Sequence, residues 1–129
     1  MILCIDIGNT SIAYSIWSNN QFQTINRIET KKHSLIINEK NQLTNIAISS
    51  VVPDLTDYYI NYFIEYCNIK PFIVNHNNCN ITLDVDNPNE VGPDRICNVF
   101  GAQKKYGTPC LVVDFGSATT YDIINNNGD

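Results

Sequence analysis

The 129-residue sequence has little of what marks several common protein classes. Its five cysteines are odd in number and form no C-x-x-C pair, which argues against a disulfide framework or a zinc site and favours a reducing compartment. Only eight Lys and Arg residues stand against 13 Asp and Glu, and this net charge of −5 argues against nonspecific nucleic-acid binding. No apolar run approaches the roughly 20 residues of a membrane-spanning helix, and the first strand follows Met1 at once, leaving no room for a signal peptide. We therefore expect a cytoplasmic protein with neither a membrane nor a nucleic acid as partner.

The composition that remains, 43% hydrophobic and 16% charged, is that of a globular protein with a packed core. Apolar patterning predicts strands over 2–6, 11–17, 22–28, 45–51 and 71–74. Helices are predicted over 31–41, from an N-cap at Asp54 through Tyr66, and over 93–106 between Pro93 and Gly107. The resulting order β-β-β-α-β-α-β-α predicts an α/β fold that begins with an antiparallel hairpin.

A further hairpin follows residue 107, and the sequence has nothing behind it for the hairpin to pack against. An isolated two-stranded hairpin is marginal in water. We therefore expect one domain over 1–107 and the start of a second, truncated domain over 108–129.

One short pattern occurs twice, as Asp6-Ile7-Gly8-Asn9-Thr10 and as Asp114-Phe115-Gly116-Ser117-Ala118. In each copy an aspartate ends an apolar strand, and a glycine turn leads into a second strand. Glycine lets backbone N–H groups come close to a phosphate, whereas the carboxylate would repel the phosphate unless a cation lay between them. A single D-x-G turn is also typical of an ordinary hairpin, but the repetition predicts a nucleotide site with a bound cation.

A third cluster runs from Asn87 to Arg95, where a loop becomes a helix. The free N–H groups and the dipole of a helix N-terminus favour anions. Arg95 offers a planar fork for a substrate carboxylate, and Asp94 is placed to accept a proton from a substrate hydroxyl. The alternative is that Asp94 only caps the helix and that Arg95 is a solvated neighbour.

These three motifs, with Ser49, Val52 and Pro53 between them and Asn98 after them, occur in an order that closely resembles the type III pantothenate kinases. This family belongs to the sugar-kinase/actin/chaperone-ATPase superfamily. The resemblance covers essentially the whole chain but only the N-terminal half of a family member, so we expect this chain alone to be an inactive part of an enzyme.

The resemblance implies an RNase H-like (actin-like ATPase) domain with a mixed sheet, followed by the first hairpin of a second, similar domain. It implies ATP-dependent phosphorylation of pantothenate to 4′-phosphopantothenate, the first step of coenzyme A biosynthesis, by an enzyme that is a homodimer when complete. ATP, Mg²⁺ and a monovalent cation, K⁺ or NH₄⁺, are implied with it.

The resemblance also assigns roles to residues of this sequence. Asp94 is the implied proton acceptor, Asp114 the ligand of the monovalent cation, and Asp6 the group nearest Mg²⁺. The implied ATP-binding residues are Asp6, Ile7, Gly8, Asn9, Thr10, Ser11, Ile12, Ala13 and Ser117. The implied pantothenate-binding residues are Val85, Gly92, Pro93, Asp94 and Arg95.

Three of these positions depart from the usual family pattern. Pro93 replaces alanine and suits the first turn of a helix, and Ser117 replaces threonine and keeps the hydroxyl group. Val85 stands where tyrosine is frequent, so we expect one pantothenate contact to be absent.

Two other functions are alternatives to this one. A non-catalytic, kinase-like regulatory or binding module is disfavoured because Asp6, Asp94, Arg95 and Asp114 are all retained. A metal-dependent nuclease would use the same three aspartates around two metal ions, but the acidic charge and the lack of a basic groove argue against it.

Overall fold

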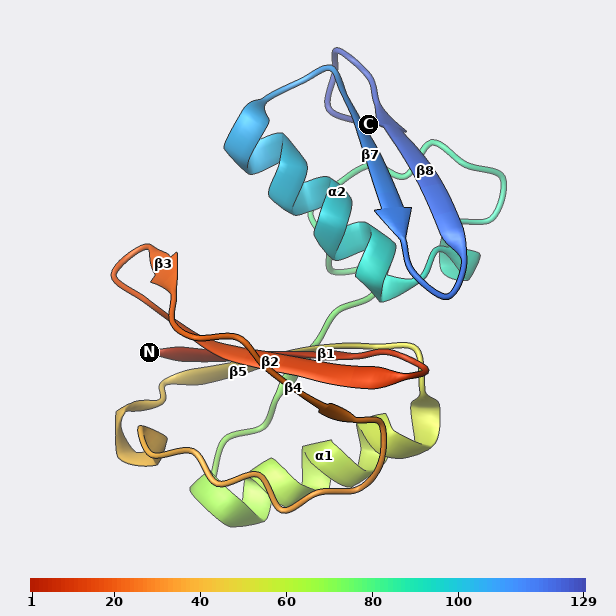
Figure 1. The fold of residues 1–129 in the computed structure, drawn as a ribbon. Helices are drawn as coiled ribbons and strands as arrows, with labels where there is room; N and C mark the ends of the chain where they lie inside the picture. Colours follow the sequence, from red (N-terminus) through yellow and green to blue (C-terminus); the bar gives the residue numbers. More distant parts are fainter. The chain divides into compact units, whose positions relative to one another are not determined.

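The computed structural model describes residues 1–129 and divides them into two compact units, Met1–Ile73 and Val74–Asp129 (Figure 1). The division falls earlier in the chain than the predicted boundary at residue 107. The reason is that helix α2 (Pro93–Tyr106) makes its contacts with the two strands that follow it, and so belongs to the same unit as the hairpin.

The first unit is built on a mixed sheet with the strand order β3-β2-β1-β5-β6, and β4 also pairs with β2. Strand β1 runs antiparallel to β2 and parallel to β5, which confirms a mixed α/β fold with an antiparallel start. The six strands are β1 (Ile2–Ile7), β2 (Ser11–Ser18), β3 (Gln21–Phe22), β4 (Asn26–Glu29), β5 (Asn45–Ser50) and β6 (Phe72–Ile73). The single strand predicted over 22–28 is therefore two short strands, both paired with β2.

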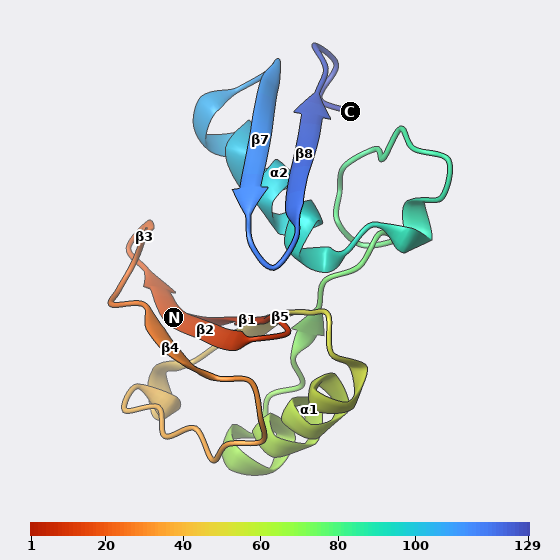
Figure 2. The same cartoon turned by 45° about the vertical axis from the view of Figure 1, so that its right-hand side comes forward.

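Helix α1 (Pro53–Cys67) covers one face of this sheet (Figure 2). Its buried residues Leu55, Tyr59 and Phe63 recur every four positions, which places them on one side of the helix. They pack against alternate residues of the strands, with Leu3, Ile5, Ile7, Ile46 and Ile48 all buried in the same core. Burying such side chains contributes about 1.5–3 kcal/mol each.

The prediction that Asp54 caps this helix is wrong. Pro53 takes the first helical position, Val52 is the N-cap, and Asp54 lies in the first turn. Proline is favoured there because the N–H group that it lacks would have no partner within the helix.

The helix predicted over 31–41 is also wrong, since this segment is irregular apart from a 3₁₀ turn at Lys40–Gln42. Its backbone is bound instead by tyrosines of α1. The hydroxyl groups of Tyr58, Tyr59 and Tyr62 donate to the carbonyl oxygens of His33, Lys31 and Leu35 over 3.0, 2.9 and 2.7 Å. Tyr59 and Tyr66 also accept hydrogen bonds, from the N–H groups of His33 and Ile37. Backbone groups that would be hydrogen-bonded to one another in a helix are thus hydrogen-bonded to the tyrosines of α1.

The second unit consists of α2, a 3₁₀ turn at Pro88–Glu90, and the hairpin of β7 (Cys110–Phe115) and β8 (Thr119–Ile124). The bounds predicted for this helix, 93–106, are confirmed. Ile96 of α2 and Ile124 of β8 are buried, which marks the face of the hairpin that packs on the helix. Neither α1 nor α2 has the length and apolarity that a membrane-spanning helix requires.

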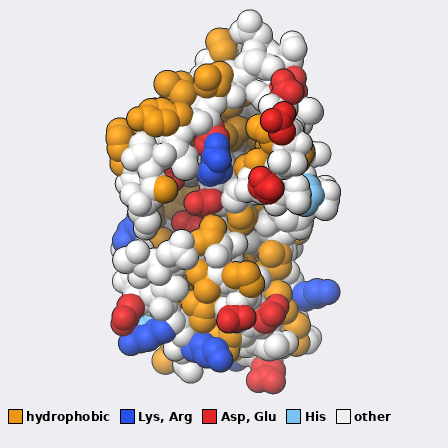
Figure 3. Space-filling view, turned by 90° about the vertical axis from the view of Figure 1, so that its right-hand side faces the viewer, with side chains coloured by type: hydrophobic (Ala, Val, Ile, Leu, Met, Phe, Trp, Pro, Cys, Tyr) orange, Lys and Arg blue, Asp and Glu red, His pale blue; other side chains and the backbone are white.

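The other face of the hairpin is exposed. Large hydrophobic side chains alternate along it, so the surface of this unit carries a hydrophobic patch (Figure 3, orange side chains at the upper left). The exposed residues are Leu111, Val113, Phe115, Tyr121 and Ile123.

Replacing Tyr59 with phenylalanine should lower the free energy of unfolding of the first unit by about 1–3 kcal/mol. The substitution leaves the Lys31 carbonyl and the His33 N–H group without their partner. Urea unfolding of the whole protein measures the loss, and amide hydrogen exchange should show faster exchange at His33. Tyr106→Phe is the control, because Tyr106 is exposed and makes no such bond. Unchanged exchange at His33 would contradict this account of the segment.

Candidate functional site

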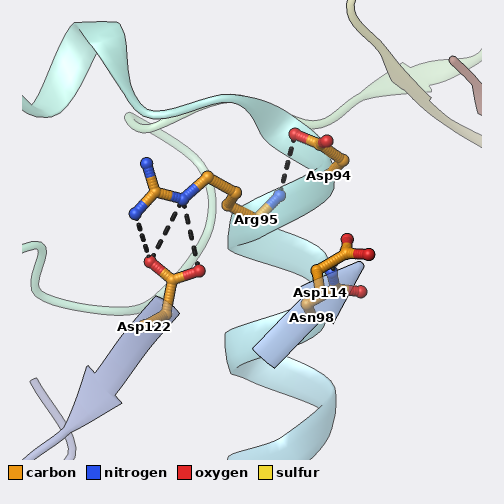
Figure 4. Close-up of polar contacts among 5 residues, drawn as sticks. All are labelled: Asp94, Arg95, Asn98, Asp114 and Asp122. Carbon is orange, nitrogen blue, oxygen red and sulfur yellow. Dashed lines mark hydrogen bonds and ion pairs between the residues drawn. The ribbon is translucent and has the colours of Figure 1, made fainter. Parts of the chain in front are cut away.

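Asp94 lies in the first turn of α2, immediately after Pro93. Its Oδ1 accepts a hydrogen bond from the backbone N–H of Arg95 over 2.9 Å, and its other carboxylate oxygen makes no hydrogen bond within the protein (Figure 4). The N-cap of the helix is Gly92, which offers no side chain. Asp94 is therefore not the N-cap residue, and one oxygen of its carboxylate is left to accept a proton.

Gly92 has a steric reason to be glycine. A Cβ atom built at this position would lie 2.5 Å from Oδ1 of Asp94, which is too close for any real Cβ. The backbone conformation, with φ of −61°, is open to every residue type. Gly92 is thus needed to leave room for the Asp94 carboxylate, and any side chain there would displace it.

Arg95 forms an ion pair with Asp122 of β8 (Figure 4). Its Nε lies 3.1 and 3.2 Å from the two carboxylate oxygens of Asp122, and its Nη2 lies 2.5 Å from Oδ1. The hydrogen bonds to Asp122 raise the pKa of Arg95 above its usual value. The alternative that Arg95 is only a solvated neighbour is therefore wrong.

The pair opens onto a cavity of about 250 Å³ within the second unit. The polar residues of its lining are Thr82, Asp84, Arg95, Asp122, Asn125 and Asp129. The other walls are mainly apolar and include Ile81, Leu83, Val85, Val91, Ile96, Val99 and Ile123. A cavity with apolar walls and a few convergent polar groups is the usual form of a small-molecule site.

The second D-x-G motif forms the β7–β8 turn in the same unit. Asp114 accepts a hydrogen bond at Oδ2 from the side-chain amide of Asn98, over 2.9 Å. Asn98 lies one helical turn after Asp94 on α2. The N–H of Gly116 closes the turn on the carbonyl of Ala118, and Ser117 between them is exposed.

The first D-x-G motif forms the β1–β2 turn of the first unit. The N–H of Gly8 donates to the carbonyl of Ser11 over 3.0 Å, and a Cβ at Gly8 would lie only 3.1 Å from that oxygen. Thr30 holds the other side of the turn through a 2.7 Å hydrogen bond from its hydroxyl to the Gly8 carbonyl. Asn9 and Thr10, at the tip, are exposed. The turn is thus fixed from two sides while its tip stays accessible.

Two buried hydroxyl oxygens, Ser49 Oγ and Thr120 Oγ1, have no hydrogen-bond partner in the protein. Each lies on the strand next to a motif aspartate and in register with it, Ser49 beside Asp6 and Thr120 beside Asp114. Buried polar groups are nearly always satisfied, so each orphan points to a bound water or ion. Oxygen donors of this kind suit Mg²⁺ and K⁺.

No group of three or more His, Cys, Asp and Glu side chains is assembled anywhere in the chain. A cation at either aspartate would therefore complete its coordination with water or phosphate oxygens. That arrangement is the usual one for Mg²⁺ at a nucleotide, which keeps several waters and takes one or two carboxylates from the protein.

The structure places the predicted residues in two groups. The second unit holds Val85, Gly92, Pro93, Asp94, Arg95, Asp114 and Ser117, whereas Asp6 through Ala13 belong to the first unit. Asp122 was missed by sequence reasoning. The available signal was the two-residue period of the hairpin, because Asp114 and Asp122 share the face that packs on α2.

Comparison with known proteins agrees with the motifs. A family model described as type III pantothenate kinase matches residues 2–129. Among curated proteins, the type III pantothenate kinase of Thermomicrobium roseum is 34% identical over 99% of this chain and 55% of its own length. Those of Agathobacter rectalis and Geobacter sulfurreducens are 36% and 35% identical, over 99% and 100% of this chain and 55% and 56% of their own length.

The chain therefore spans about half the length of the curated relatives that it matches. Because the family match runs from the first strand to the last residue and includes all three motifs, the chain belongs to the type III pantothenate kinase family.

Proposed function

We propose that the protein carrying this chain phosphorylates pantothenate with ATP to give 4′-phosphopantothenate, the first step of coenzyme A biosynthesis. The observation that carries the proposal is the start of α2, where Asp94 has a free carboxylate oxygen and the next residue, Arg95, lines a cavity. The names of the relatives supply the substrate.

Asp94 is proposed as the proton acceptor. The primary hydroxyl of pantothenate attacks the γ-phosphorus of ATP, its proton passes to the free oxygen of Asp94, and ADP leaves. In phosphoryl transfer the protein acts mainly by positioning and by electrostatic stabilisation. The space that Gly92 leaves for this carboxylate supports the assignment.

Arg95 is proposed to bind the carboxylate of pantothenate at the other end of the substrate, with Gly92 and Pro93 nearby and Val85 in the wall of the cavity. The apolar walls suit the methyl groups and methylenes of pantothenate, and the cavity of about 250 Å³ suits a small ligand. Val85 gives less contact area than a tyrosine would.

The turn from Asp6 to Ala13, together with Ser117, is proposed to bind ATP. Backbone N–H groups between Gly8 and Ser11 are suited to phosphate oxygens, and the rigid turn described above supports this role. Mg²⁺ held near Asp6 would offset charge on the transferred phosphoryl group, and Asp114 is proposed to hold K⁺ or NH₄⁺.

Several features of the whole protein are part of the proposal. They are RNase H-like domains with the second beginning near residue 108, action as a homodimer, and a place in the cytoplasm. Within this chain α2 packs on the hairpin, so the boundary near 108 stays a prediction about the complete enzyme.

The test is ADP release by the whole protein with ATP, Mg²⁺, K⁺ and pantothenate, with the phosphorylated product identified by mass. Activity should require pantothenate and should fall when K⁺ is replaced by Na⁺. Binding of pantothenate without turnover would support the non-catalytic module instead.

Asp94→Asn should lower kcat by at least about 100-fold, because the amide cannot accept the proton from the hydroxyl. The KM for ATP should change little. Asp86→Asn is the matched control, since Asp86 is an exposed carboxylate in the loop before the same helix and makes no hydrogen bond. A kcat close to that of the wild type in Asp94→Asn would exclude Asp94 as the proton acceptor.

Gly92→Ala should lower kcat by about 10-fold or more while the protein stays folded, because the new Cβ displaces the Asp94 carboxylate. Gly101→Ala in the same helix is the control. A Cβ there has nothing within 4 Å, so this variant should keep its activity and gain about 0.5–1 kcal/mol of helix stability. Equal kcat values for the two variants would show that the space beside Gly92 has no catalytic importance.

A further inference from the structure

Asp122 makes its contacts with only one edge of the Arg95 guanidinium. Nε and Nη2 both donate to its carboxylate, over 3.1 Å and 2.5 Å to Oδ1, and these two nitrogens form the side-on edge of the group. Nη1 points away from Asp122 and makes no hydrogen bond in the protein (Figure 4). The end-on edge therefore keeps one N–H from each terminal nitrogen, which is the fork that binds a carboxylate bidentately.

The two partners differ in how firmly they are held. The side chain of Asp122 is 14% exposed and lies on the face of β8 that packs on α2, whereas that of Arg95 is 36% exposed and has a long flexible stem. Asp122 is the fixed member of the pair. Without Asp122, the guanidinium group would be more exposed to solvent and free to rotate. Its end-on edge would then have no fixed direction.

We propose that Asp122 is a positioning residue, which holds the side-on edge of Arg95 so that the end-on edge faces a carboxylate in the cavity and selects acceptors that carry one. This inference rests on the proposed function, because it takes the substrate carboxylate to be the ligand of Arg95. Val85, Asp84 and Arg95 line the same cavity within the second unit.

Replacing Asp122 has two opposing effects on the KM for pantothenate, so the direction in which this KM changes is informative. Asp122 also neutralises Arg95, and removing its charge would by Coulomb attraction alone strengthen the binding of a second carboxylate. Positioning predicts a higher KM for pantothenate when Asp122 is replaced, and charge competition predicts a lower one. The sign of the change therefore separates the two roles.

The experiment compares steady-state kinetics of the whole protein with those of Asp122→Asn and Asp122→Glu. Asp122→Asn keeps the shape of the side chain and should raise the KM for pantothenate about 10-fold, with kcat and the KM for ATP within about twofold of wild type. Asp122→Glu keeps the charge and should restore part of the affinity. In an Arg95→Gln background, Asp122→Asn should change the KM for pantothenate by less than about twofold, because its effect acts through Arg95.

Asp86→Asn is the matched control, because Asp86 is an exposed carboxylate outside the cavity lining and makes no hydrogen bond to Arg95. It should not raise the KM for pantothenate. Melting temperatures of all variants show whether each is folded.

The proposal is overturned by an unchanged or lower KM for pantothenate in Asp122→Asn. It is also overturned if kcat and both KM values move together, or if the effect persists without Arg95, since those results indicate a purely structural ion pair. A wild-type protein that does not phosphorylate pantothenate would overturn the proposed function itself. An active wild type with any of the other outcomes overturns only the role of Asp122.

Discussion

The chemistry of the second unit depends on the attachment of one helix to one hairpin. The first part of α2 is attached to β7 and β8 through three side chains of different kinds. These are Arg95, which pairs with Asp122, the buried Ile96, and Asn98, which donates a hydrogen bond to Asp114. The Arg95 side chain of this pair is 36% exposed, so solvent weakens the pair, and the buried Ile96 supplies most of the free energy. The polar contacts instead fix the rotation of the helix, and with it the direction of the Asp94 carboxylate.

In the first unit, the turn that we propose to bind phosphate is held on a rigid base. Strand β1 is hydrogen-bonded on both sides, and its buried residues anchor it to α1. The strand therefore reaches the Gly8 turn in a fixed direction. Thr30 restrains the far side of that turn, so its backbone N–H groups need little reordering on binding an anion.

The sequence predicts correctly those elements that depend on residues close together in the chain. The helix 93–106 was predicted correctly because proline begins it and glycine ends it, and both act through their own backbone. The two D-x-G turns and the hairpin were found for the same reason. The repeat of the motif, more than either copy, indicated a nucleotide site.

The sequence does not predict contacts between residues that are far apart in the chain. A helix is predicted over 31–41, but hydrogen-bonding groups of this segment are bound by tyrosines 25–29 positions further along. Asp122 is the only charged residue of β8, and its partner lies 27 positions away. No local rule predicts either contact, because both form only after α1 and α2 have packed on their strands.

The tyrosine contacts also bear on the order in which the first unit folds. The segment after Glu29 has no regular structure of its own until the 3₁₀ turn, so it becomes ordered only when α1 is docked. Lys31 and Lys32 lie at its start and are exposed. A protease that cleaves after lysine will therefore gain access to this segment when α1 detaches. Where reclosing is faster than cleavage, the cleavage rate measures the fraction of molecules in which the helix has left the sheet.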